Sequence, residues 1–349
     1  MNKPDKQSNI PMLKYIALWF TIWRVHLELI AWAARKMVPI REGFLGSVPW
    51  ANFDGLHYLS IAERGYVQFE QAFFPVYPIL IRRLGILLHD DFLLAGLLIS
   101  NICFIGVLIL TWKLVIKLFY RRKNRETIAR QTIISLLFFP TSYYFGSVYT
   151  ESLFLLCVLG AWYLLLEHRR ILFGIVAGIA SGIRFVGAFL GVPVGLIMYM
   201  HYLYQSTGDP LLFIHAQPAF GANRTGGDLI ILPQVIWRYM KIYTTVPLYQ
   251  YDYWIAVLEM AIFLFSLVVL WCAWKSKLPR NWIYFSLLSI VMPTLTGTLS
   301  SMPRYVLVAF PMFIVLGMMR EPYRNQLLGV LYVLFIILTA LFVTGHWVA

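Results

Sequence analysis

The sequence predicts an all-α, polytopic membrane protein, and three observations carry this prediction. The 349-residue chain is 60% hydrophobic and only 13% charged, whereas soluble domains are about 45–50% apolar and about 25% charged. It contains repeated apolar segments of about 20 residues, the length that an α-helix needs to cross the hydrocarbon core of a bilayer. Its basic residues gather in short loops between these segments. We therefore expect one transmembrane domain over residues 1–349, with about eight to eleven membrane-crossing helices.

The first apolar segment, residues 13–34, is expected to be a retained transmembrane helix. It contains Lys14, Arg24, His26 and Glu28 and lacks the uninterrupted apolar core and small-residue cleavage site of a signal peptide. Arg24 and Glu28 are four residues apart, so an ion pair on one helix face is expected.

The remaining spans follow from apolar length along the chain. Residues 171–205 form one apolar run of double length, which is interrupted by Gly182, Arg184, Gly187, Gly191 and Pro193. The other spans are expected near 92–119, 131–148, 151–167, 253–274, 281–299, 304–320 and 327–346.

Loop charge sets the orientation. The loops 121–130, 168–170, 275–280 and 320–325 are basic and are assigned to the cytoplasm. The long segments 35–91 and 206–252 have equal numbers of acidic and basic residues and are assigned to the non-cytoplasmic side. The chain between 171 and 252 must then cross an odd number of times, as one long kinked helix or as two shorter helices and a third pass near 229–247.

The charge distribution and the residue patterns of the chain disfavour several functional classes. The net charge of +13 is explained by the basic cytoplasmic loops, so nucleic-acid binding is not expected. Cys103, Cys157 and Cys272 lie singly in apolar segments, which indicates neither a disulfide framework nor a metal site. The His and Asp residues form no metal-binding pattern, so no cofactor or divalent metal is expected. A glycine-rich phosphate loop for nucleotides is also lacking.

The segment 50–66 concentrates polar chemistry in the first non-cytoplasmic loop and has the mixed polarity of a short interfacial helix. Gly65 is a typical helix stop. Asp54 has two interpretations. It is either an N-cap of this helix or a general base, whose pKa is raised by partial desolvation beside the lipid.

Several motifs resemble the PIG-V family, the GPI mannosyltransferase 2 proteins and their prokaryotic relatives. The first loop carries FDGLHYLSIAERGY (53–66) and AFFPVYP (72–78), which are similar to the family's first luminal loop. Phe53 stands where the family usually has tryptophan. Further similar segments, in the family's order, are FFPTSYYFGSVYTESLFLL (138–156), GIASGIRFVG (178–187), GDPLLFIHAQ (208–217) and SMPRYVLVAFP (301–311).

This resemblance implies a GT-C-type glycosyltransferase fold, a helical bundle whose first non-cytoplasmic loop carries a catalytic acidic residue. It implies inverting transfer of mannose from a polyprenyl or dolichyl phosphate donor to a lipid-linked or glycan acceptor. Asp54 then takes the general base role.

Four more residues are candidates for substrate binding. Arg304, at the outer start of a span, is either a cation for the leaving lipid phosphate or a snorkelling interface anchor. Arg184 lies inside an apolar run, where a charge marks a site or a paired partner. Glu151, at the outer start of a helix, either stabilises the helix N-terminus by its charge or is a partner for Arg184 or Arg64. His57, one helical turn after Asp54, is expected to contact substrate or orient the carboxylate.

Two alternatives stay open at this stage. Enzymes of the same fold transfer other hexoses, and the choice of mannose as the transferred sugar depends on the family resemblance. A transporter or flippase for a lipid-linked sugar is the rival from another class, and it predicts polar sites at the midplane and an internal repeat. The membrane is expected to be the cell membrane in a prokaryote or the endoplasmic reticulum in a eukaryote.

Overall fold

The fold is all-α, as predicted. The computed structural model describes residues 11–44 and 48–349, which form helices and no strand. Four of the described helices are long and apolar enough to cross a membrane, and they identify a multi-pass membrane protein. They are α1 (Met12–Met37), α4 (Phe92–Leu118), α11 (Tyr251–Lys275) and α15 (Tyr323–Val343).

The long helices present apolar side chains on both their inner and their outer faces. In α1, Trp23, Leu27 and Ala31 are fully buried, whereas Leu29 is 57% and Trp32 is 60% exposed. An exposed apolar face is unfavourable in water and stable in lipid. The expected ion pair between Arg24 and Glu28 is confirmed, with 2.5 Å between nitrogen and oxygen.

Two expected spans are interrupted, which corrects the prediction. Residues 131–148 contain the end of α5 (Arg125–Leu137) and then the buried 3₁₀ turn η3 (Ser142–Gly146), because Pro140 cannot continue a helix. Residues 304–320 contain short pieces rather than one helix: α13 (Met302–Tyr305), η6 (Val306–Val308) and α14 (Pro311–Met318). The helices near the other expected spans are α6 (Glu151–Leu166) and α12 (Arg280–Thr294).

The double-length run is also broken, as its glycines indicated. It forms α7 (Arg170–Ser181), η4 (Phe185–Leu190) and α8 (Val194–Thr207), so it is two helices rather than one kinked helix. A Cβ on Gly195 would lie 2.5 Å from the Gly178 carbonyl oxygen, so α8 begins in close contact with α7. The chain continues through α9 (Leu212–His215) and η5 (Gln217–Phe220) to α10 (Leu232–Thr245).

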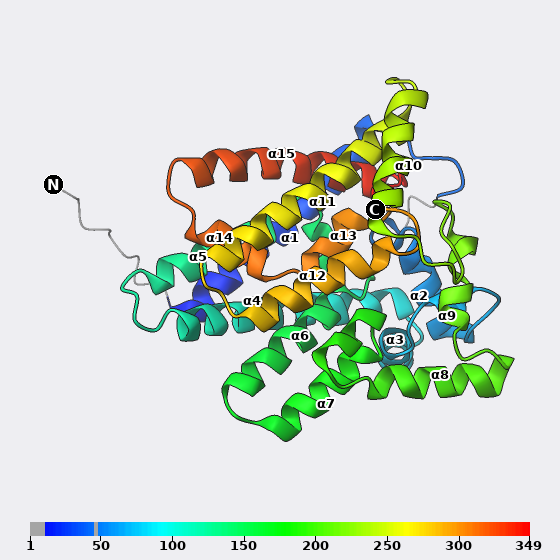
Figure 1. The fold of residues 1–349 in the computed structure, drawn as a ribbon, viewed down its shortest axis with the longest axis horizontal. Helices are drawn as coiled ribbons and strands as arrows, with labels where there is room; N and C mark the ends of the chain where they lie inside the picture. The colour runs from blue at the N-terminus through cyan, green and yellow to red at the C-terminus, as the bar shows by residue number, and fades with distance from the viewer. Residues whose placement is uncertain (1–10, 45–47) are drawn as a thin grey trace.

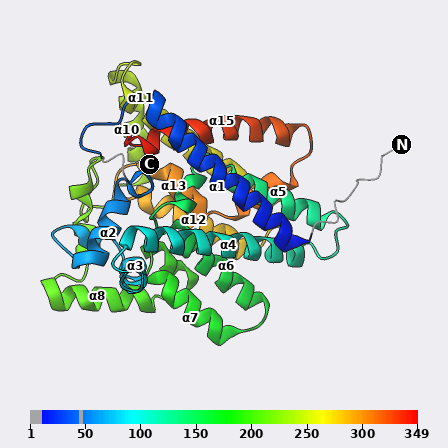
Figure 2. The same ribbon diagram turned by 180° about the vertical axis from the view of Figure 1, so that it is seen from behind.

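The first loop contains the predicted short helix, α2 (Asp54–Arg64), between η1 (Pro49–Ala51) and η2 (Glu70–Ala72). Gly65 ends α2 with a φ of 86°, which confirms the expected stop. The loop closes with α3 (Val76–Leu87). Figures 1 and 2 show α2, α9 and α10 together at one end of the molecule, opposite the α4–α5 turn. The described parts of the segments 35–91 and 206–252, which loop charge assigned to one side of the membrane, thus lie at the same end of the molecule (Figures 1 and 2).

Candidate active site

The carboxylate of Asp54 is bound by an arginine and does not cap α2. Asp54 is the first residue of α2, and Phe53, with a φ of 59°, occupies the N-cap position without a side-chain hydrogen bond. The Arg304 guanidinium donates to Oδ2 of Asp54. The N-cap interpretation of Asp54 is therefore wrong.

Arg304 reaches Asp54 from a segment 250 residues away in the chain. It lies in α13, three residues after Ser301, and only 7% of it is exposed. Its guanidinium lies 5.4 Å from the ring centre of Tyr149 and 5.5 Å from that of Tyr305. A snorkelling arginine keeps its head in water, so the interpretation of Arg304 as an interface anchor is wrong.

Glu151 links Arg304 to Arg184. It lies in the first turn of α6, is 1% exposed, and its Oε1 is 3.1 Å from Arg184 and 3.4 Å from Arg304. The expected pairing with Arg184 is confirmed. The alternative partner, Arg64, donates to Ser60 instead. The four residues thus form a continuous ion-pair chain, Asp54–Arg304–Glu151–Arg184.

The ion pair lowers the pKa of Asp54, contrary to the prediction from sequence. Burial by itself raises the pKa of this carboxyl group. The positive charge and hydrogen bond of Arg304 outweigh burial, and Arg224 and His57 act in the same direction, so the pKa lies below its ordinary value. The expectation of a raised pKa is wrong because it took account of burial and not of the counter-ion.

His57 lies beside the ion-pair chain and is not part of it. Its Nδ1 is 3.3 Å from Oε1 of Glu70, and its ring stacks on Phe73 with 4.9 Å between centroids. Glu70 is buried and also accepts a hydrogen bond from Ser60. This arrangement ties α2 to the turn at 70–73. It gives His57 a partner other than the Asp54 carboxylate.

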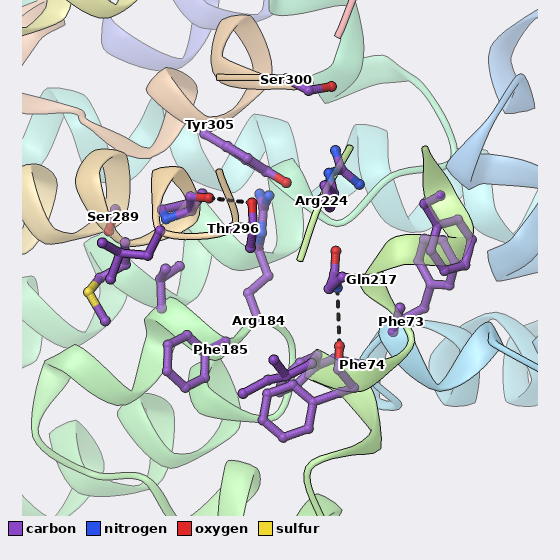
Figure 3. Close-up of a pocket in the computed structure, with 18 of the residues that line it drawn as sticks. Phe73, Phe74, Arg184, Phe185, Gln217, Arg224, Ser289, Thr296, Ser300 and Tyr305 are labelled. Carbon is purple, nitrogen blue, oxygen red and sulfur yellow. Dashed lines mark hydrogen bonds between the residues drawn. The ribbon is translucent and has the colours of Figure 1, made fainter. Parts of the chain in front are cut away.

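A cavity of about 310 Å³ opens beside Asp54, Arg184 and Arg304. Figure 3 shows Arg184 and Arg224 pointing toward the same part of this cavity, near Tyr305. Aromatic and apolar side chains also line it, namely Phe73, Phe74, Phe185, Phe213, Ile214 and Phe220. Figure 3 shows Phe73, Phe74 and Phe185 on the side of the cavity away from Tyr305. The cavity therefore combines a charged wall with an apolar one, as ligand sites commonly do.

Sequence reasoning missed several residues of this site. Arg224, in the loop between η5 and α10, donates from Nη2 to Oγ of Ser301 at 3.2 Å. Tyr58, Gln217 and Tyr305 also line the cavity. Their local sequence carries no signal, because a loop arginine or an interfacial tyrosine is common in any membrane protein.

Within residues 11–44 and 48–349, no three His, Cys, Asp or Glu residues are grouped to hold a metal ion. The candidate site is thus built from carboxylates, guanidiniums and aromatic rings.

The comparisons with known proteins gave one match. The family model described as Mannosyltransferase (PIG-V) matches residues 37–274, which is 238 of 349 residues. This range includes Asp54, Glu151, Arg184 and Arg224 and ends before Arg304. No curated protein and no solved structure matched the chain.

Proposed function

Because this chain belongs to the PIG-V family of mannosyltransferases, we propose the donor, the acceptor class and the base of its reaction. The protein is a glycosyltransferase by this membership. The proposed reaction moves mannose from a polyprenyl phosphate donor to a hydroxyl group of a lipid-linked or glycan acceptor, on the non-cytoplasmic face. The observation that carries the proposal is the Asp54 carboxylate paired with Arg304 at the wall of the cavity.

The proposed chemistry is an inverting displacement at the anomeric carbon of the sugar. The acceptor oxygen forms a bond to this carbon while the bond from carbon to the phosphate oxygen breaks. Asp54 takes the proton of the acceptor hydroxyl. The lipid phosphate leaves with its charge changed from one to two negative units, and the guanidiniums of Arg304 and Arg184 stabilise that added charge.

An apolar groove next to the cavity supports a lipid-linked donor. The groove has a volume of about 950 Å³ and lies between α3, α7 and α8. Residues 73–74 and 183–185 line the cavity, whereas 75–76 and 182 line the groove. The backbone N–H of Val76 donates to the Gly182 carbonyl where the two meet. A sugar phosphate in the cavity therefore has an adjacent apolar surface for its prenyl chain.

Replacement of Asp54 by asparagine tests the base. Asp54→Asn keeps the size of the side chain and removes the proton acceptor, so the transfer rate falls by at least about 10²-fold. In the assay, radiolabelled polyprenyl phosphate mannose is added to membranes that contain the protein, and the glucose analogue is tested in parallel. The products are separated by chromatography.

Glu63→Gln is the matched control, since Glu63 is an exposed acid on the same helix. It is expected to leave the rate unchanged. Transfer by Asp54→Asn at the wild-type rate would show that Asp54 is not the base. Purified protein in liposomes that moves the labelled sugar lipid across the bilayer unchanged would instead indicate a flippase.

A further inference from the structure

We propose that Arg224 binds the phosphate of the sugar donor, which makes the second non-cytoplasmic segment part of the donor site. This inference rests on the proposed function and adds a residue to it. Arg224 lies in the loop between η5 and α10, 80 residues before Arg304 in the sequence.

The loop that carries Arg224 is fixed to the segment that precedes Arg304. The backbone N–H of Thr225 donates to the Thr296 carbonyl at 2.9 Å, and that of Ile230 donates to the Leu295 carbonyl at 2.9 Å. These two bonds hold residues 225 and 230 of the loop against residues 295–296. The position of Arg224 over the cavity is therefore determined by the backbone.

Arg224 meets the turn that begins α13. Its guanidinium donates to Ser301, which has a φ of 68° and directly precedes α13. Arg304 lies three residues further on. Both arginines line the same cavity.

The pairing of charges around the cavity singles out Arg224. Asp54 and Glu151 are paired with Arg304 and Arg184. No carboxylate among the described residues lies within 4.0 Å of the Arg224 guanidinium, and its hydrogen-bond partner is the neutral hydroxyl of Ser301. Asp228, on the same loop, lines the cavity and is exposed. Arg224 therefore keeps most of its donors available.

Asp54 and Glu151 compensate the charges of Arg304 and Arg184, so the guanidinium of Arg224 adds a positive charge to the cavity that a bound anion would offset. Arg184 and Arg224 point toward the same region near Tyr305 in Figure 3. The phosphodiester of a sugar donor supplies one negative charge and two free oxygens, which match the paired N–H groups of an arginine. A donor phosphate bound in this region would accept hydrogen bonds from Arg224 and Arg184.

Steady-state kinetics of Arg224→Gln test the inference. Loss of a hydrogen bond to a charged group predicts a donor KM raised by about 10- to 100-fold. The acceptor KM stays unchanged, because the acceptor carries no phosphate at this position. Arg224→Lys keeps the positive charge, so its donor KM is expected to lie between those of the wild type and Arg224→Gln. Lys241→Gln removes an exposed cation of the same segment and is the matched control.

Binding of farnesyl phosphate, followed by tryptophan fluorescence, separates this inference from the proposed function. If the wild-type protein transfers mannose and Arg224→Gln has the same donor KM, the role of Arg224 is wrong and the proposed function stands. If the wild-type protein transfers no mannose from the lipid donor, the proposed function fails. Equal affinity of wild type and Arg224→Gln for farnesyl phosphate would then overturn the Arg224 assignment as well.

Discussion

Replacing Glu151 by glutamine removes the negative charge that two arginines share. In the native protein, Oε1 of Glu151 lies 3.1 Å from Arg184 and 3.4 Å from Arg304. The substitution keeps the shape of the side chain. It leaves the buried guanidinium of Arg304 and the partly exposed one of Arg184 with Asp54 as the remaining carboxylate of the ion-pair chain.

The expected loss of stability follows from these distances and from burial. At an effective dielectric constant of about 20, unit charges at this separation attract one another by about 5 kcal/mol per pair. Desolvation offsets much of that attraction, and removal of one partner of a buried pair typically costs about 3–5 kcal/mol. Glutamine still offers a carbonyl oxygen to one arginine, so we expect a loss of about 3 kcal/mol in the free energy of unfolding.

Reversible unfolding in mixed micelles measures this quantity for Glu151→Gln, Arg184→Gln and the double variant. The double variant should lose less than the sum of the two single losses by about 0.5–3 kcal/mol, since the first substitution already breaks the shared pair. Glu167→Gln is the matched control. It breaks an exposed pair with Lys117 at the loop ends of α6 and α4 and should leave the free energy of unfolding nearly unchanged. A loss below about 1 kcal/mol for Glu151→Gln, or simple additivity, would refute the reasoning.

Two further predictions concern the pH profile and the packing of η4. In Arg304→Gln, burial of Asp54 remains while the charge that lowers its pKa is gone. The pKa of Asp54 therefore rises, and the acid side of the pH profile of kcat/KM for residual transfer moves to higher pH. An unchanged acid side would contradict the pairing of Asp54 with Arg304. Gly187→Ala places a Cβ 2.3 Å from the Ala180 carbonyl oxygen, so we expect a loss of about 1–3 kcal/mol in stability and slower transfer. Gly329→Ala, which has open space, is the control in thermal unfolding.

The sequence predicted those parts of the fold that depend on local pattern. Apolar length identified the long helices. Gly65 predicted the end of α2, and the glycines after residue 181 predicted the break between α7 and α8. A charge inside an apolar run required a partner, which Glu151 supplies to Arg184.

The errors arose where distant segments meet. Asp54 and Arg304 are 250 residues apart, and no periodicity connects them, so their pairing and the lowered pKa of Asp54 were not visible. The interruption of 131–148 was hidden because apolar length was counted across Pro140. Arg224 was missed because its place in the site depends on the bonds between its loop and residues 295–301, which lie far away in the sequence.

The resting ion pair has a consequence for the proposed catalysis. A carboxylate bound to Arg304 is a weak base, because the arginine stabilises its charged form. A donor phosphate that binds Arg304 competes with Asp54 for the same N–H groups, and any loss of that bond raises the basicity of Asp54. Binding of the donor then prepares the base, and deprotonation of an acceptor is favoured only when a sugar is present to receive it. Within the proposed function, the ion pair thus couples donor binding to activation of the acceptor.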